Sequence, residues 1–111
     1  MLEEIDEWDI EVAHKNCGLP GVYIGRPSPW GNPFHVSAGV TREDVIARYE
    51  TWLRNQLRES WQTRKLFDML CKHVEDHKPL RLLCYCAPKP CHGDVIKKLI
   101  EERLSCTSNS S

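Results

Sequence analysis

The sequence contains no long hydrophobic run and no marked excess of charge of one sign. No apolar segment in the 111 residues approaches the roughly 18 residues of a membrane-spanning helix. The formal net charge is -1, which argues against a protein that is basic over its whole surface and binds nucleic acid through it. The N-terminal segment MLEEIDEWDIEV is acidic and lacks the charged-then-apolar order of a signal peptide. We therefore expect a cytoplasmic protein with no membrane partner; a nucleic-acid partner would need a local basic patch, which the net charge does not indicate.

The sequence also lacks the C-x-x-C pairs of common zinc sites, although it contains 6 cysteines. An even number of cysteines in a short chain can form a disulfide framework, but this pattern is typical of secreted proteins. Because we expect an intracellular protein, we predict reduced thiols.

Repeats and internal linkers are absent as well, which favours a single domain. With 41% hydrophobic residues, the chain can bury one modest core. We predict a domain over residues 1–104, and the polar segment SCTSNSS, residues 105–111, is typical of a disordered tail.

Strand and helix patterns alternate along the chain and predict an α/β fold. GVYIGR (21–26) and LRLLCYC (80–86) are rich in β-branched or apolar residues and indicate strands, and the near-continuous apolar run of the second predicts burial on both faces. The acidic N-terminal segment is compatible with a further strand or with a frayed end. Helical periodicity covers residues 41–57, 66–74 and 91–104. We predict a small, single-domain, Rossmann-like α/β fold, with a partly parallel sheet and flanking helices.

Each predicted helix has one apolar stripe, and the first has a clear start signal. Thr41 is placed to cap the first helix, with Asp44 at the third helical position. The three stripes consist of Val45, Tyr49, Trp52, Leu53 and Leu57; of Leu66, Phe67, Met69, Leu70 and Val74; and of Val95, Ile96, Leu99, Ile100 and Leu104.

Two unusual loops, YIGRPSPWGNPF and CAPKPCHGD, directly follow the two predicted strands. Ligands of open parallel sheets bind beyond the carboxyl ends of the strands. If the two strands are parallel neighbours, both loops lie at the same edge of the sheet and can form one pocket.

The first loop is stiffened by three prolines and is equipped for binding. Arg26 can hold a phosphate or carboxylate, Trp30 can stack on a base, and Asn32 can bind a polar edge or the backbone of its own turn. An equally plain interpretation is a rigid loop that closes the end of the core with Trp30 and Phe34. The candidate ligand-binding residues of this loop are Gly25, Arg26, Ser28, Trp30, Gly31 and Asn32.

Three interpretations of the second loop stay open. A zinc site would use Cys84, Cys86, Cys91 and His92, but their spacing is not that of common sites. A catalytic site would use Cys91 as a nucleophile, because a helix N-terminus can lower the pKa of a thiol.

In the catalytic interpretation His92 and Asp94 are the partners of Cys91. The third interpretation is an anion site at the N–H groups of Gly93 and Asp94, with Cys86 also facing the ligand. Cys84 by itself is more typical of a core residue.

Taken together, YIGRPSPWGNPF, the helix with TRED, Tyr and Trp-Leu, and L-CYCAPKPCHGDVI resemble the domain-of-unknown-function family 4326, which occurs in bacteria and bacteriophages. The resemblance runs from about Val22 to Leu99. It implies positions and no activity: the motif residues of the two loops are Gly25 to Ser28, Trp30 to Phe34, Cys84, Cys86, Pro88 and Cys91 to Asp94.

These observations favour a protein that binds a small phosphorylated, nucleotide-like ligand between the two loops, with the question of catalysis and of a cofactor left open. One alternative is a non-catalytic, phage-type interaction module that binds a host enzyme through Trp30 and Phe34. Another is a structural zinc module.

Overall fold

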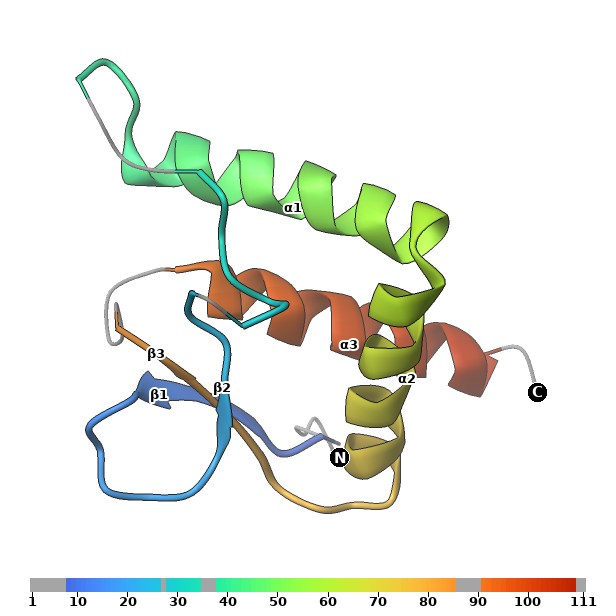
Figure 1. Cartoon of the computed structure of the whole chain (residues 1–111). Coiled ribbons are helices and arrows are strands. Elements are labelled where there is room, and N and C mark those ends of the chain that lie inside the picture. The colour runs from blue at the N-terminus through green and yellow to red at the C-terminus, as the bar shows by residue number, and fades with distance from the viewer. Residues whose placement is uncertain (1–7, 27, 35–37, 86–90, 110–111) are drawn as a thin grey trace, which may run out of the picture.

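The computed structural model describes residues 8–26, 28–34, 38–85 and 91–109. Within these ranges the chain forms three strands and three helices, as Figure 1 shows. Their order is β1 (Ile10–His14), β2 (Val22–Tyr23), α1 (Arg42–Glu59), α2 (Trp61–Glu75), β3 (Leu80–Cys84) and α3 (His92–Asn109). The predicted small α/β fold with flanking helices is confirmed.

The strands form one sheet in the order β1-β3-β2, and both pairs are parallel. Ile10 of β1 pairs with Leu80, and Val22 of β2 pairs with Leu82. β2 is shorter than the predicted segment 21–26, because Gly25 already accepts a turn hydrogen bond from Ser28. The parallel arrangement brings the carboxyl ends of all three strands to one edge.

The helices cover mainly one face of this sheet. Along β3, Leu80, Leu82 and Cys84 are buried, whereas Arg81 and Leu83 between them are only partly buried. The prediction that this strand is buried on both faces was therefore wrong: its apolar run includes Leu83, which lies on the less covered face. α3 packs on β1 and β3, α1 packs on α3 and α2, and α2 connects α1 to β3 (Figure 1).

The predicted start and inner face of α1 are confirmed. Thr41 caps the helix by accepting a hydrogen bond from the Asp44 amide, and the Asp44 carboxylate accepts one from the Thr41 amide. All five residues of the predicted α3 stripe are buried as well. In α2, Met69 is 60% exposed, so its place in the predicted apolar stripe was wrong. Cys71, which was not part of the predicted stripe, is buried. α2 begins at Trp61, because Ser60 caps it by accepting from the Thr63 amide, a signal that the apolar pattern alone did not include.

α3 continues past the predicted domain boundary at residue 104 and reaches Asn109, so it extends into the segment predicted as a tail. No helix within the described ranges combines the length and the hydrophobicity needed to cross a bilayer.

Candidate functional site

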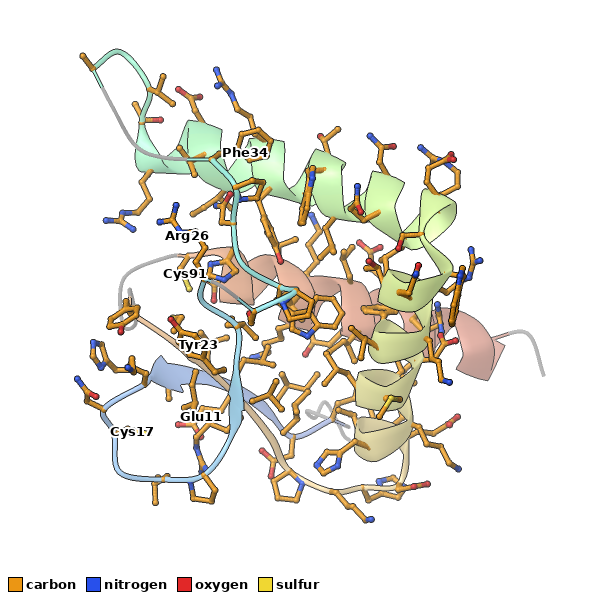
Figure 2. All side chains as sticks on the ribbon, viewed as in Figure 1. Glu11, Cys17, Tyr23, Arg26, Phe34 and Cys91 are labelled. Atoms are coloured by element: carbon orange, nitrogen blue, oxygen red, sulfur yellow. The ribbon has the colours of Figure 1, made fainter. Side chains whose placement is uncertain are left out.

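The carboxyl edge of the sheet borders a cavity of about 420 Å³. Figure 2 shows Tyr23, Arg26, Phe34 and Cys91, from both unusual loops, at this end of the molecule. From the first loop the cavity is lined by Tyr23, Gly25, Arg26, Asn32 and Phe34, and from the second by Cys91 and His92. Arg42, Val45 and Ile46 of α1 and Tyr85 after β3 complete the lining.

The first loop is folded by its own backbone and held by two buried side chains. Successive turns form where the Ser28 amide donates to the Gly25 carbonyl and the Gly31 amide to the Ser28 carbonyl. The Tyr49 hydroxyl donates to the Trp30 carbonyl at 2.7 Å. His92 Nε2 lies 2.7 Å from the Ile24 carbonyl, which can only accept, so this nitrogen carries the proton. α1 and α3 thus fix the loop at two points.

Trp30 lies in the core and not in the cavity. Its side chain is 4% exposed and packs against Phe67 with ring centroids 6.5 Å apart. The stacking role predicted for Trp30 does not fit this position, because the indole faces cannot receive a second flat group. The plain interpretation, in which Trp30 closes the end of the core, fits it.

Two of the candidate glycines serve the packing of neighbouring side chains. A Cβ on Gly31 would lie 2.8 Å from Cγ of Arg26, and a Cβ on Gly93 would lie 2.8 Å from Cγ1 of Val12 and 2.9 Å from Cδ1 of Ile24. The absence of a side chain at Gly31 therefore leaves room for the aliphatic part of Arg26. At Gly93 it allows α3 to pack closely against the sheet. The space beside the Cα of Gly93 is therefore filled by side chains of the protein itself.

The two polar candidates of the first loop differ in position. Asn32 lines the cavity, and its Oδ1 accepts from the Phe34 amide at 2.8 Å, the backbone role predicted as one alternative. Ser28 does not line it; its hydroxyl is buried and has no hydrogen-bond partner among the described residues.

Cys91 caps α3. Its sulfur accepts a hydrogen bond from the Gly93 amide at 3.3 Å, while the Cys91 amide donates to Asp94 Oδ2 at 3.1 Å. This reciprocal pattern resembles a capping box, but a thiol replaces the usual hydroxyl and bonds the amide of the second helical residue, not the third. Since the Asp94 amide also donates to the Cys91 carbonyl, the N–H groups of Gly93 and Asp94 are used within the cap. These bonds weigh against the predicted anion site at the two groups, which stays a prediction.

The environment of Cys91 opposes ionisation of its thiol. The side chain is 3% exposed, and burial, assisted by the hydrogen bond with Cys84, raises the pKa of Cys91 to about 12. The lowered pKa predicted from the helix N-terminus is wrong, because desolvation outweighs the hydrogen bond from the Gly93 amide, which acts in the opposite direction. Burial likewise lowers the pKa of His92, so its imidazole is neutral. Asp94, the third candidate catalytic residue, serves the cap.

The thiols of Cys84 and Cys91 lie in contact, with 3.2 Å between the sulfur atoms. Cys86 lies outside the described residues. Among the residues that the structure describes, no three His, Cys, Asp or Glu side chains are grouped so as to hold a metal ion.

Sequence reasoning missed several cavity residues. Arg42 follows the cap of α1, but only the packing of α1 against α3 brings this end of the helix to the sheet edge. Tyr23 and Tyr85 lie edge to face with centroids 6.1 Å apart, and Lys15 donates to the Tyr85 hydroxyl at 2.9 Å. The lysine lowers the pKa of Tyr85, mainly through this hydrogen bond. The sequence signal that could have identified Tyr85 as a cavity residue was its position next to Cys86, a candidate ligand-binding residue.

The family model described as Domain of unknown function (DUF4326) matches residues 10–102, which run from β1 into α3 and include both loops. The chain belongs to the DUF4326 family. A relative in Enterobacteria phage T4, described as "Uncharacterized 12.4 kDa protein in nrdA-td intergenic region", is 33% identical over 79 residues. The alignment covers 71% of this DUF4326 chain and 66% of the phage protein, which is slightly less than two thirds of its length. No solved structure matches the DUF4326 chain.

Proposed function

We propose that this protein binds a small phosphorylated, nucleotide-like ligand in the cavity at the carboxyl edge of its sheet. The observation that carries the proposal is that Arg26 and Arg42 line the same cavity, and that no carboxylate is among the described residues that line it. Two guanidinium groups suit a phosphate, because each presents a planar fork of donors to its oxygens.

The deep wall of the cavity adds no charge that would offset the arginines. The Cys91 thiol has its pKa raised to about 12, and the pKa of His92 is lowered, so both groups are neutral near pH 7. Two arginines and two neutral groups in one lining favour a ligand with an anionic group and an uncharged remainder.

The remainder of the ligand meets aromatic side chains. Tyr23, Phe34 and Tyr85 line the cavity, and Tyr85 is 59% exposed. These rings supply the stacking surface that we had expected Trp30 to provide, and the side-chain amide of Asn32 supplies a polar contact. The cavity of about 420 Å³ lies within the roughly 300–1,000 Å³ of small-molecule sites.

A thermal-shift screen against nucleotides, nucleosides and sugar phosphates tests the proposal. A ligand at about 100 times its Kd adds about 2.7 kcal/mol to the free energy of unfolding, which raises Tm by several degrees in a domain of this size. Arg26→Ala and Arg42→Ala should each weaken binding about 10- to 100-fold, because each removes a charge-assisted contact.

Arg48→Ala is the matched control, since Arg48 is an exposed arginine on α1 that does not line the cavity. Binding that survives both cavity variants, or that falls equally in the control, would contradict the proposal. A panel without any phosphorylated hit would do the same.

The two alternative functions have less support. An interaction module would have used Trp30 and Phe34 as its anchor, but Trp30 is buried against Phe67. A zinc module would have used Cys84, Cys86, Cys91 and His92, but the described part of the chain, which does not include Cys86, contains no group of three His, Cys, Asp or Glu side chains that could hold a metal ion.

A further inference from the structure

Two thiols in contact, one in the lining of the cavity and one behind it, are placed for chemistry of their own. Cys84 ends β3 and is fully buried, and Cys91 caps α3 and lines the cavity. Their sulfur atoms are 3.2 Å apart, whereas a disulfide bond measures about 2.05 Å, so a closing movement of about 1 Å joins them. Among the described residues one further cysteine is buried, Cys71, which lies in α2 and does not line the cavity.

We propose that Cys84 and Cys91 form a redox-active dithiol that a peroxide entering through the cavity converts to an intramolecular disulfide. The accessible partner reacts first: the Cys91 sulfur attacks one peroxide oxygen, the O–O bond breaks, and Cys91 becomes a sulfenic acid as water leaves. The Cys84 sulfur then attacks the Cys91 sulfur, the S–O bond breaks, and a second water leaves with the Cys84 proton. Each sulfur loses one electron, and the peroxide accepts both.

The order of the two steps follows from access. Cys91 borders the cavity, while Cys84 lies beneath it and has no exposed surface. Cys84 is therefore the resolving thiol, and its contact with Cys91 lets it capture the sulfenic acid before a second peroxide arrives. The disulfide would link the end of β3 covalently to the cap of α3, next to the cavity residue His92. This chemistry does not depend on which ligand the cavity binds.

The test uses the full-length, reduced protein in its folded state, treated with hydrogen peroxide, alkylated and digested with chymotrypsin. Cleavage after Tyr85 separates Cys84 from Cys86 and Cys91, so a disulfide of Cys84 appears as a pair of linked peptides. We expect linked peptides in the unaltered protein and in Cys86→Ser, and none in Cys91→Ser. Cys71→Ser, which removes another buried thiol, should leave the linkage unchanged.

Two further observations distinguish the roles of the thiols. In Cys84→Ala the sulfenic acid should persist on Cys91, where a sulfenic-acid reagent labels it, whereas in Cys91→Ser the Cys84 thiol should stay unmodified. The initial rate should rise about tenfold per pH unit from pH 7 to 9, because the thiolate is the attacking form and its pKa lies well above this range.

Circular dichroism checks that each variant is folded. A folded protein that forms no linked peptides, or one whose linkage is lost in Cys86→Ser, would overturn the proposal. The same linkage and rate in urea would also overturn it, since the native contact of the two sulfurs would then play no part.

Discussion

Single side chains fix the first loop, and Tyr49 is the clearest of them. Its ring is fully buried, and its hydroxyl donates to the Trp30 carbonyl. His92 meets the same ring edge to face at 5.0 Å and holds the other end of the loop through Ile24. The residues that shape the cavity wall are thus tied to the core by hydrogen bonds to two backbone carbonyls.

Removing only the Tyr49 hydroxyl should reveal the importance of this contact. Tyr49→Phe keeps the ring but leaves the Trp30 carbonyl buried without its donor, so we expect the free energy of unfolding to fall by about 1–3 kcal/mol. Tyr23→Phe is the control, because the Tyr23 hydroxyl donates to the Arg26 carbonyl at an exposed site where water can replace it. Urea denaturation measures both, and we expect a change within about 0.5 kcal/mol for the control. Equal effects in the two variants would contradict the assigned role of Tyr49.

At the scale of elements, the cap of α3 fixes the start of this helix directly after Cys91. Asp94 accepts from the Cys91 amide just as Asp44 accepts from the Thr41 amide at the start of α1. Both carboxylates also lie in the first turn of a helix, where the macrodipole favours a negative charge.

Asp94→Ala should therefore lower the free energy of unfolding by about 0.5–2 kcal/mol, the usual range for loss of a cap. Asp44→Ala in α1 is the matched comparison and should lose a similar amount. Thermal denaturation followed by circular dichroism measures both losses. If Asp94→Ala were as stable as the unaltered protein, the hydrogen bond to Cys91 would not contribute to the cap.

Elements with a local signal could be predicted from the sequence, and those that depend on distant contacts could not. Thr41 and Asp44 specify the start of α1 by themselves, and the α3 stripe follows from its spacing. The burial of Trp30 depends on Phe67 of α2, far along the chain, so composition left its role open. The raised pKa of Cys91 depends on the depth of α3 against the sheet, which no local pattern expresses.

The whole molecule buries several titratable groups in their neutral forms, and its stability should depend on pH in both directions. Burial lowers the pKa of His92. As the pH falls below about 6.5, His92 therefore binds a proton in the unfolded chain before it does so in the folded chain. Stability should then decrease with acidification, by at most about 1.4 kcal/mol per pH unit for this group. Above about pH 8.5 the sign reverses: the unfolded chain loses the Cys91 proton, while the folded chain keeps it up to about pH 12.

Urea denaturation from pH 5 to 10 measures the loss of stability on the acid side and on the alkaline side. One variant tests the group assigned to each side. His92→Gln keeps a side-chain donor within reach of the Ile24 carbonyl but does not titrate, so the acid decrease should become shallower while the alkaline decrease is unchanged. Cys91→Ser should flatten part of the alkaline decrease and leave the rest, because burial also raises the pKa of Cys71 to about 11. An acid decrease that is identical in His92→Gln would show that His92 titrates alike in the folded and unfolded chains, and the neutral wall inferred for the cavity would then be wrong.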